Sequence, residues 1–151
     1  MPKYFAYGSN ISERRIGDER KVPYTSRTFA VLEDYELLFD KTSATKGKGY
    51  ANISPARGKH VEGFLYDTTD AGIAILDNYE GYPVHYERHR LVVSTPTGRA
   101  EAVAYVAPSS QRAQGLCPSR DYLDYLLDGR EEFSEEYLLR LERQAVFERR
   151  T

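Results

Sequence analysis

The chain has 151 residues with a formal net charge of −2, and its composition, 40% hydrophobic and 29% charged, is ordinary for a globular protein. A chain of this length can bury a core of its own, so we expect a single domain over residues 1–151. The weakly acidic balance argues against a nucleic-acid-binding protein, because a phosphate backbone is met by a basic surface.

The remaining composition points to a soluble, intracellular protein. There is no charged leader before an apolar run, and no stretch approaches the ~20 apolar residues that span a bilayer. We therefore expect a soluble, cytoplasmic protein without a membrane partner. Cys117 is the single cysteine, which excludes an intrachain disulfide and a four-thiolate metal site, and we expect a packed thiol there.

The first half of the sequence predicts mainly strands. Aromatic and β-branched residues bounded by turn residues predict strands over 4–7, 27–32 and 35–39. The small, polar and basic stretch "KTSATKGKG", residues 41–49, predicts a solvated surface loop. A short strand resumes at Tyr50 in "YANIS", and "HVEGFLYD", residues 60–67, alternates like another strand.

The second half adds helices around one hairpin. Residues 70–79 predict a helix with a capping cluster at 68–70, a buried stripe through Ile73 and Leu76, and a stop at Gly81 and Pro83. Residues 86–94 and 99–107 predict two strands joined by the turn "TPTG".

Two helices are expected after the hairpin. One covers 120–128 with Ser119 as N-cap and Gly129 just past its end, and the other follows Ser134 and continues to "ERR", residues 148–150, with an apolar face that includes Ala145. The whole order predicts an α+β fold, with a mixed, mainly antiparallel sheet that closes toward a barrel and is flanked by helices.

The first candidate site is "YGSN", Tyr7-Gly8-Ser9-Asn10. Glycine permits close approach, and successive backbone N–H groups at such a turn can form a cradle for a carboxylate or phosphate. The alternative is an ordinary turn in which Ser9 or Asn10 caps a short helix at 11–16.

The second candidate is Glu80, in "LDNYEGYPVHYERH". A carboxylate at a helix C-terminus faces the negative end of the helix dipole, which raises its pKa when it is poorly solvated and suits it to general acid–base work. The alternative is a solvated surface glutamate, which is what we expect of Asp77. A metal site at His85 and His89 is not expected, since residues four apart in a strand lie ~13 Å from each other.

The two candidates, in this order along the chain, resemble the γ-glutamylcyclotransferase family. The matching features are "YFAYGSN", "LDNYEGYPVHY" with its acid directly before glycine, Tyr105 in "AVAYVA" and Tyr122 in "PSRDY", and they cover residues 4–129. The resemblance implies a mixed β-barrel with flanking helices and a cavity at one end.

The resemblance also implies roles. The loop of Tyr7, Gly8, Ser9 and Asn10 would hold a γ-glutamyl group, Glu80 would be the catalytic acid and base, and Tyr86, Tyr105 and Tyr122 would line the pocket. The implied reaction releases 5-oxoproline and a free amine, with neither metal nor cofactor. The leaving-group side would lie in residues 41–52 and 107–117. A homodimer is one option for the assembly.

Two other functions remain open at this point. One is a non-catalytic module that binds a γ-glutamyl or other carboxylate metabolite on the same scaffold, although simple carboxylate binding gains nothing from a second carboxylate at Glu80. The other is a protein-interaction module that docks through the basic loop at 41–48.

Overall fold

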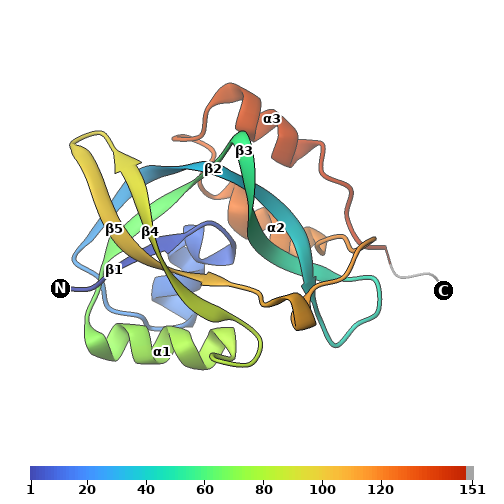
Figure 1. The fold of residues 1–151 in the computed structure, drawn as a ribbon, viewed down its shortest axis with the longest axis horizontal. Coiled ribbons are helices and arrows are strands. Elements are labelled where there is room, and N and C mark those ends of the chain that lie inside the picture. The colour runs from blue at the N-terminus through green and yellow to red at the C-terminus, as the bar shows by residue number, and fades with distance from the viewer. Residues whose placement is uncertain (149–151) are drawn as a thin grey trace.

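Five strands close into a barrel with helices on its outside (Figure 1). The computed structural model describes residues 1–148, so most of the "ERR" at 148–150 lies outside the described residues. Around the barrel the order is β1 (Lys3–Ala6), β3 (Gly49–Asp67), β2 (Ser26–Thr42), β4 (Glu87–Thr95) and β5 (Gly98–Val106). All neighbours are antiparallel except β1 and β5, which pair in parallel at Tyr4 and Val103. The predicted mixed, mainly antiparallel barrel is confirmed.

Strands β2 and β3 form one long hairpin in place of the four shorter strands expected from the sequence. The pairing register shifts between Glu33 and Tyr35, and Asp34 between them has a positive φ of 62°. An unpaired residue with a left-handed backbone that interrupts the pairing of two strands forms a β-bulge, which bends the strand without ending it. The polar residues at 33–34 therefore mark a bend, not the gap between two strands.

Helix α1 (Asp70–Glu80) runs along one side of the barrel, at the bottom of Figure 1, and keeps the predicted limits to within a residue. The Thr69 hydroxyl accepts the Gly72 N–H at 3.0 Å and starts the helix. Gly81, with a φ of 65°, ends it in the left-handed conformation that glycine adopts without a steric cost. Ile73 and Leu76 are buried as expected.

The C-terminal helices are shorter than the sequence suggested. Helix α2 (Arg120–Leu127) begins at its predicted cap, Ser119. Gly129 does not adopt the expected left-handed C-cap conformation; its missing side chain makes room for Ile11, Phe64 and Phe133. Helix α3 (Glu135–Glu142) is capped by Ser134 and ends before the exposed Ala145, so the prediction of a helix that continues to 148–150 is wrong where the structure describes it.

The segment after β1 also differs from the helix expected at 11–16. A 3-10 turn, η1 (Ser9–Ile11), is followed by a π-helix, η2 (Arg14–Glu19), and neither has a side-chain cap. The proposal that Ser9 or Asn10 caps a helix is therefore wrong. The Asn10 side chain is used elsewhere, as described below.

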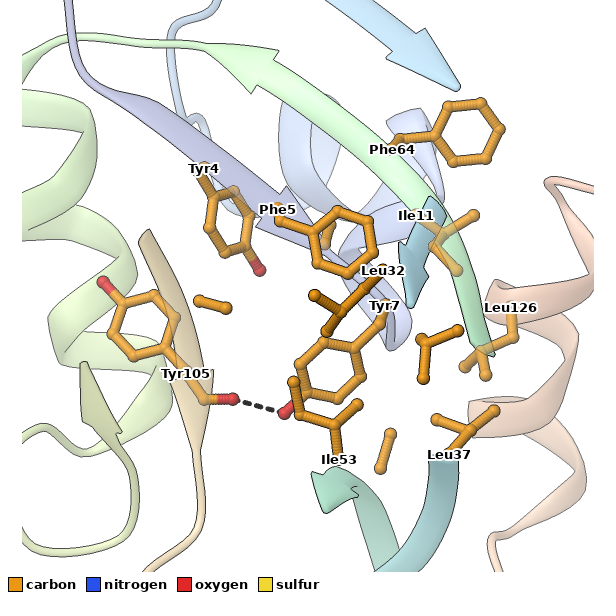
Figure 2. Packing of buried hydrophobic residues seen from close by; sticks show 14 of the residues in the cluster. Tyr4, Phe5, Tyr7, Ile11, Leu32, Leu37, Ile53, Phe64, Tyr105 and Leu126 are labelled. Atoms are coloured by element: carbon orange, nitrogen blue, oxygen red, sulfur yellow. Dashed lines mark hydrogen bonds between the residues drawn. The ribbon is translucent and has the colours of Figure 1, made fainter. Parts of the chain in front are cut away.

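The core fills the barrel and anchors the turn. Figure 2 shows Phe5 and Tyr7 packed with Leu32 and Ile53 inside the barrel, while Ile11 reaches the side chains of α2. Phe5, Ile11 and Ile53 are completely buried. The stretch from 7 to 10 is thus held between two buried anchors. Within residues 1–148, no helix is both long enough and apolar enough to cross a membrane.

Candidate functional site

A cavity of about 550 Å³ lies beside the turn that follows β1, and the candidate residues line it. Its walls come from the turn after β1, the end of α1, the start of the β2–β3 connection and the start of α2. All eight residues singled out from the sequence line this cavity: Tyr7, Gly8, Ser9, Asn10, Glu80, Tyr86, Tyr105 and Tyr122.

Hydrogen bonds to its backbone carbonyls hold the turn at 8–11 in place. Ile11 N–H donates to Gly8 O at 3.1 Å, the Tyr66 hydroxyl donates to Asn10 O at 2.8 Å, and Arg27 donates to Ile11 O at 2.7 Å. The first N–H groups of a helical turn have no carbonyl partner within that turn. The Asn10 N–H is therefore a donor at the cavity wall, and the Ser9 N–H lies against the Tyr122 hydroxyl, which lines the same cavity.

At Gly8 the backbone of the turn packs closely against Tyr122 and Ala51. A Cβ on this residue would lie 2.9 Å from the Tyr122 hydroxyl and 3.2 Å from the Ala51 Cβ. The same hydroxyl accepts the Ala51 N–H at 3.1 Å. Gly8 lets the turn, β3 and α2 meet at one corner of the cavity.

Asn10 and Arg20 form the polar floor beside Glu80. The Asn10 amide donates to the Tyr4 hydroxyl at 3.0 Å and to Glu80 Oε1 at 3.4 Å, and its oxygen accepts from Arg20 at 3.1 Å. Arg20 Nη1 lies 3.9 Å from Glu80 Oε1, and its guanidinium stacks over the Tyr79 ring at 4.6 Å. Arg20 is thus held in place by an amide, a carboxylate and a ring.

Glu80 is the last residue of α1 and faces the cavity, with 18% of its side chain exposed. Burial raises the pKa of Glu80, while the positive charges of Arg20, Arg15 and Lys41 act in the opposite direction. A carboxyl group with a raised pKa can exchange a proton closer to neutral pH than a surface glutamate can.

The pocket tyrosines use their hydroxyl groups mainly to hold the walls together. Tyr7 donates to the Tyr105 carbonyl (dashed in Figure 2), and Tyr86 donates to Ala51 O at 2.7 Å. Burial raises the pKa values of Tyr7 and Tyr86 well above the ordinary value, and Glu80 contributes to both shifts. These phenols stay neutral. Their rings line the cavity, and their hydroxyl groups fix the backbone carbonyls of Tyr105 and Ala51 in its wall.

Asp77 is not the solvated surface residue that we expected. It accepts the Tyr105 hydroxyl at 2.7 Å and Arg88 Nε at 3.0 Å, and 18% of its side chain is exposed. Burial acts to raise the pKa of Asp77, but the hydrogen bonds from Arg88 and Tyr105 outweigh it and the pKa is lowered. The aspartate ties α1 to both strands of the β4–β5 hairpin.

Lys41 also departs from the expected surface loop. It is the penultimate residue of β2, it is 3% exposed, and it lines the cavity. A signal was present, because Leu37, Phe39 and Lys41 alternate along one face of a strand and all three are buried. The sequence interpretation missed Arg15, Arg20 and Tyr4 as lining residues too.

The two histidines lie in different surroundings. His85 lines the cavity, with Nδ1 3.4 Å from Lys41 Nζ, whereas His89 lies within β4 beside Glu87. Of the two segments expected on the leaving-group side, 41–52 supplies lining residues. Residues from 107–117 instead line a second hollow beside Leu38, Phe39 and Asp40.

Comparison with known proteins now adds to this geometry. The family model described as "Gamma-glutamyl cyclotransferase, AIG2-like" matches residues 4–124, which is most of the chain. The chain belongs to this family. A γ-glutamylcyclotransferase from Bos taurus is 34% identical over 101 residues, which is 64% of this chain and 53% of the bovine protein.

Solved structures of similar proteins agree with the family assignment. A structure named gamma-glutamyl cyclotransferase superposes with a TM-score of 0.82 at 25% identity, over 97% of this chain and 89% of that one. An uncharacterized protein from Homo sapiens gives the same TM-score and identity over 99% and 90% of the two chains. The chain spans about half or less of the length of the curated relatives that it matches.

Proposed function

We propose that this γ-glutamylcyclotransferase family member converts a γ-glutamyl amide into 5-oxoproline and a free amine, with Glu80 as general acid and base. The observation that carries the proposal is the position of Glu80. Its largely buried carboxylate, with a raised pKa, lies in the same cavity as the turn at 8–10, and Asn10 contacts it at 3.4 Å.

The turn and Arg20 would hold the glutamyl half of the substrate. The backbone N–H of Asn10 suits a carboxylate, and the Arg20 guanidinium adds a positive charge next to it. Arg20 is fixed by Asn10 and by the ring of Tyr79, so it offers a prearranged charge. The α-carboxylate would then lie at the 8–10 turn, close to the Asn10 amide that also contacts Glu80.

The reaction is an intramolecular acyl transfer. The α-amine nitrogen attacks the γ-carbonyl carbon and forms the ring C–N bond; the amide C–N bond then breaks, and its electron pair leaves with the amine nitrogen. Because nucleophile and electrophile belong to one molecule, holding a folded conformer supplies most of the proximity advantage.

One carboxylate serves both proton transfers. The α-amine is an ammonium at neutral pH and must lose a proton to attack, and the departing nitrogen must gain one to leave. Glu80 would take the first proton and return it to the leaving nitrogen. The ring nitrogen then loses its second proton, which the same carboxylate would pass to the released amine, so that the amine departs as an ammonium ion. Because the pKa of Glu80 is raised, the free-energy difference between its protonated and ionised forms near neutral pH is smaller than for a surface glutamate.

The test is release of 5-oxoproline from a panel of γ-glutamyl amino acids, peptides and amines. We expect turnover by the wild type and none by Glu80→Gln, which keeps the size of the side chain and removes its charge. Glu101→Gln is the matched control, because Glu101 is 59% exposed on β5, away from the cavity.

The outcome separates the two functions that the cavity could serve. Wild-type turnover that survives Glu80→Gln would contradict the assigned role of Glu80. A wild type that binds γ-glutamyl compounds by calorimetry and releases no 5-oxoproline would instead identify a binding module.

A further inference from the structure

The cavity holds a second cationic position that the reaction described above does not use. Lys41 is 3% exposed, and its ammonium group donates to the Thr42 carbonyl at 2.7 Å and lies 3.4 Å from His85 Nδ1. It also lies 5.6 Å from the centre of the Tyr86 ring. Among residues 1–148, no carboxylate lies within ion-pair distance of this nitrogen.

Burying a cation without a negatively charged partner costs free energy. Burial lowers the pKa of Lys41, and the negative charge of Glu80 only partly opposes this effect. Buried charges in proteins are normally paired. An anion in the cavity would supply the missing partner and would favour the charged form of the amine.

Lys41 and Arg20 belong to different walls of the cavity. Arg20 contacts Asn10, Glu80 and Tyr79, next to the turn after β1. Lys41 comes from the end of β2, and its contacts are the carbonyl, imidazole and ring described above. The positive charges of Arg20 and Lys41 both act to lower the pKa of Glu80.

The surroundings of Lys41 leave room for a ligand. The adjoining lining residues Thr42, Ser43 and Ala44 are small. When Lys41 is charged it acts as the donor toward His85 Nδ1, so the imidazole carries its proton on Nε2. The ammonium and this N–H are two donors on one wall.

We propose that Lys41, with His85 beside it, recognises a carboxylate on the leaving-group half of the substrate. This rests on the proposed function, in which the turn at 8–10 and Arg20 take the glutamyl carboxylate. The substrate class is then a γ-glutamyl derivative of an amino acid or peptide, and γ-glutamyl derivatives of neutral or cationic amines are poor substrates.

A matched pair of substrates isolates this contact. γ-Glutamyl-alanine and γ-glutamyl-alaninamide share the scissile bond and differ in the leaving group's carboxylate. For a charge-assisted contact, we expect wild-type kcat/KM to favour the acid by roughly 10- to 100-fold. In Lys41→Met the ratio falls to near one, through loss of activity on the acid and mainly through KM.

The control variant is Lys59→Met, since Lys59 is 63% exposed and pairs with Glu36 on the outside of the barrel. It should keep the wild-type ratio. If Lys41 acts only by holding the charge on Glu80, Lys41→Met will slow both substrates equally and the ratio will persist, which overturns the proposal. A wild-type ratio near one also overturns it, whether or not the variant folds.

The two proposals fail in different ways. If the wild type releases 5-oxoproline from both compounds without preference, the cyclotransferase activity stands and the role of Lys41 is wrong. If it releases none, the activity is wrong, and calorimetry decides the second point: tighter wild-type binding of the acid that is lost in Lys41→Met supports the contact, and equal binding refutes it.

Discussion

A methyl group added at Gly8 should damage the site through one identifiable contact. The φ of Gly8 is −113°, so the substitution is not opposed by a left-handed backbone, and the space around the residue decides the outcome. The new Cβ would lie 2.9 Å from the Tyr122 hydroxyl, whereas ordinary contact begins at 3.4 Å. The hydroxyl or the turn must therefore shift by about half an ångström.

The expected cost follows from what that shift disturbs. The Tyr122 hydroxyl accepts the Ala51 N–H at 3.1 Å, and a net hydrogen bond is worth about 1 kcal/mol. With the overpacking of Ala51 added, we expect Gly8→Ala to lower the free energy of unfolding by about 1–2 kcal/mol. A 1 Å misplacement can cost about 100-fold in rate, so a shift of half that size should lower kcat/KM by roughly 10-fold.

A double-mutant cycle tests the cause. Tyr122→Phe removes the oxygen that the methyl group would meet, so Gly8→Ala should cost less in the Tyr122→Phe background than in the wild type, by about 1 kcal/mol in urea unfolding. Turnover should follow the same pattern. Additive effects, or a Gly8→Ala variant with wild-type stability and turnover, would refute the steric account.

Two carboxylates near the cavity should change stability with pH in opposite directions. Because the pKa of Glu80 is raised in the folded state, the wild type loses stability as pH rises from the ordinary value of 4.5 through the folded-state pKa. Glu80→Gln should therefore unfold at a higher temperature than the wild type at neutral pH, but not at pH 4. The pKa of Asp77 is lowered, so its contribution is present above the ordinary value of 3.8 and is lost as pH falls through the folded-state pKa; Asp77→Asn should cost about 1 kcal/mol at pH 7 and less in acid, measured by urea unfolding. A thermal-shift profile for either variant that runs parallel to the wild type at every pH would contradict the assignment.

The sequence predicts the features that short segments determine by themselves. The barrel class follows from the alternation of strands, and α1 follows from its cap at Thr69 and its stop at Gly81. The turn at 7–10 and Glu80 can both be recognised from a neighbouring glycine. Gly8 allows the close approach of other residues to the turn, and Gly81, directly after Glu80, adopts a left-handed φ that ends the helix.

The features that were missed depend on residues far apart in the sequence. The sequence around Asp77 predicts a surface residue, because its partners, Arg88 and Tyr105, come from the hairpin that follows. Arg20 follows a π-helix, which has no strong local signal, and it reaches the site only when that segment packs. Lys41 was assigned to a loop by composition, although the alternation of β2 continues through it.

The place of β1 in the barrel has a consequence for how the site forms. This short strand lies between β3 and β5, and its parallel pairing joins Tyr4 to Val103, about 100 positions away, which is the kind of contact that forms slowly in folding. The turn at 8–10 follows β1 directly, so its donors reach the cavity only when the pairing of β1 with β5 has formed. We therefore expect binding competence to develop together with the final cooperative step of folding, and a partly folded chain with a complete β2–β3 hairpin to have no site at all.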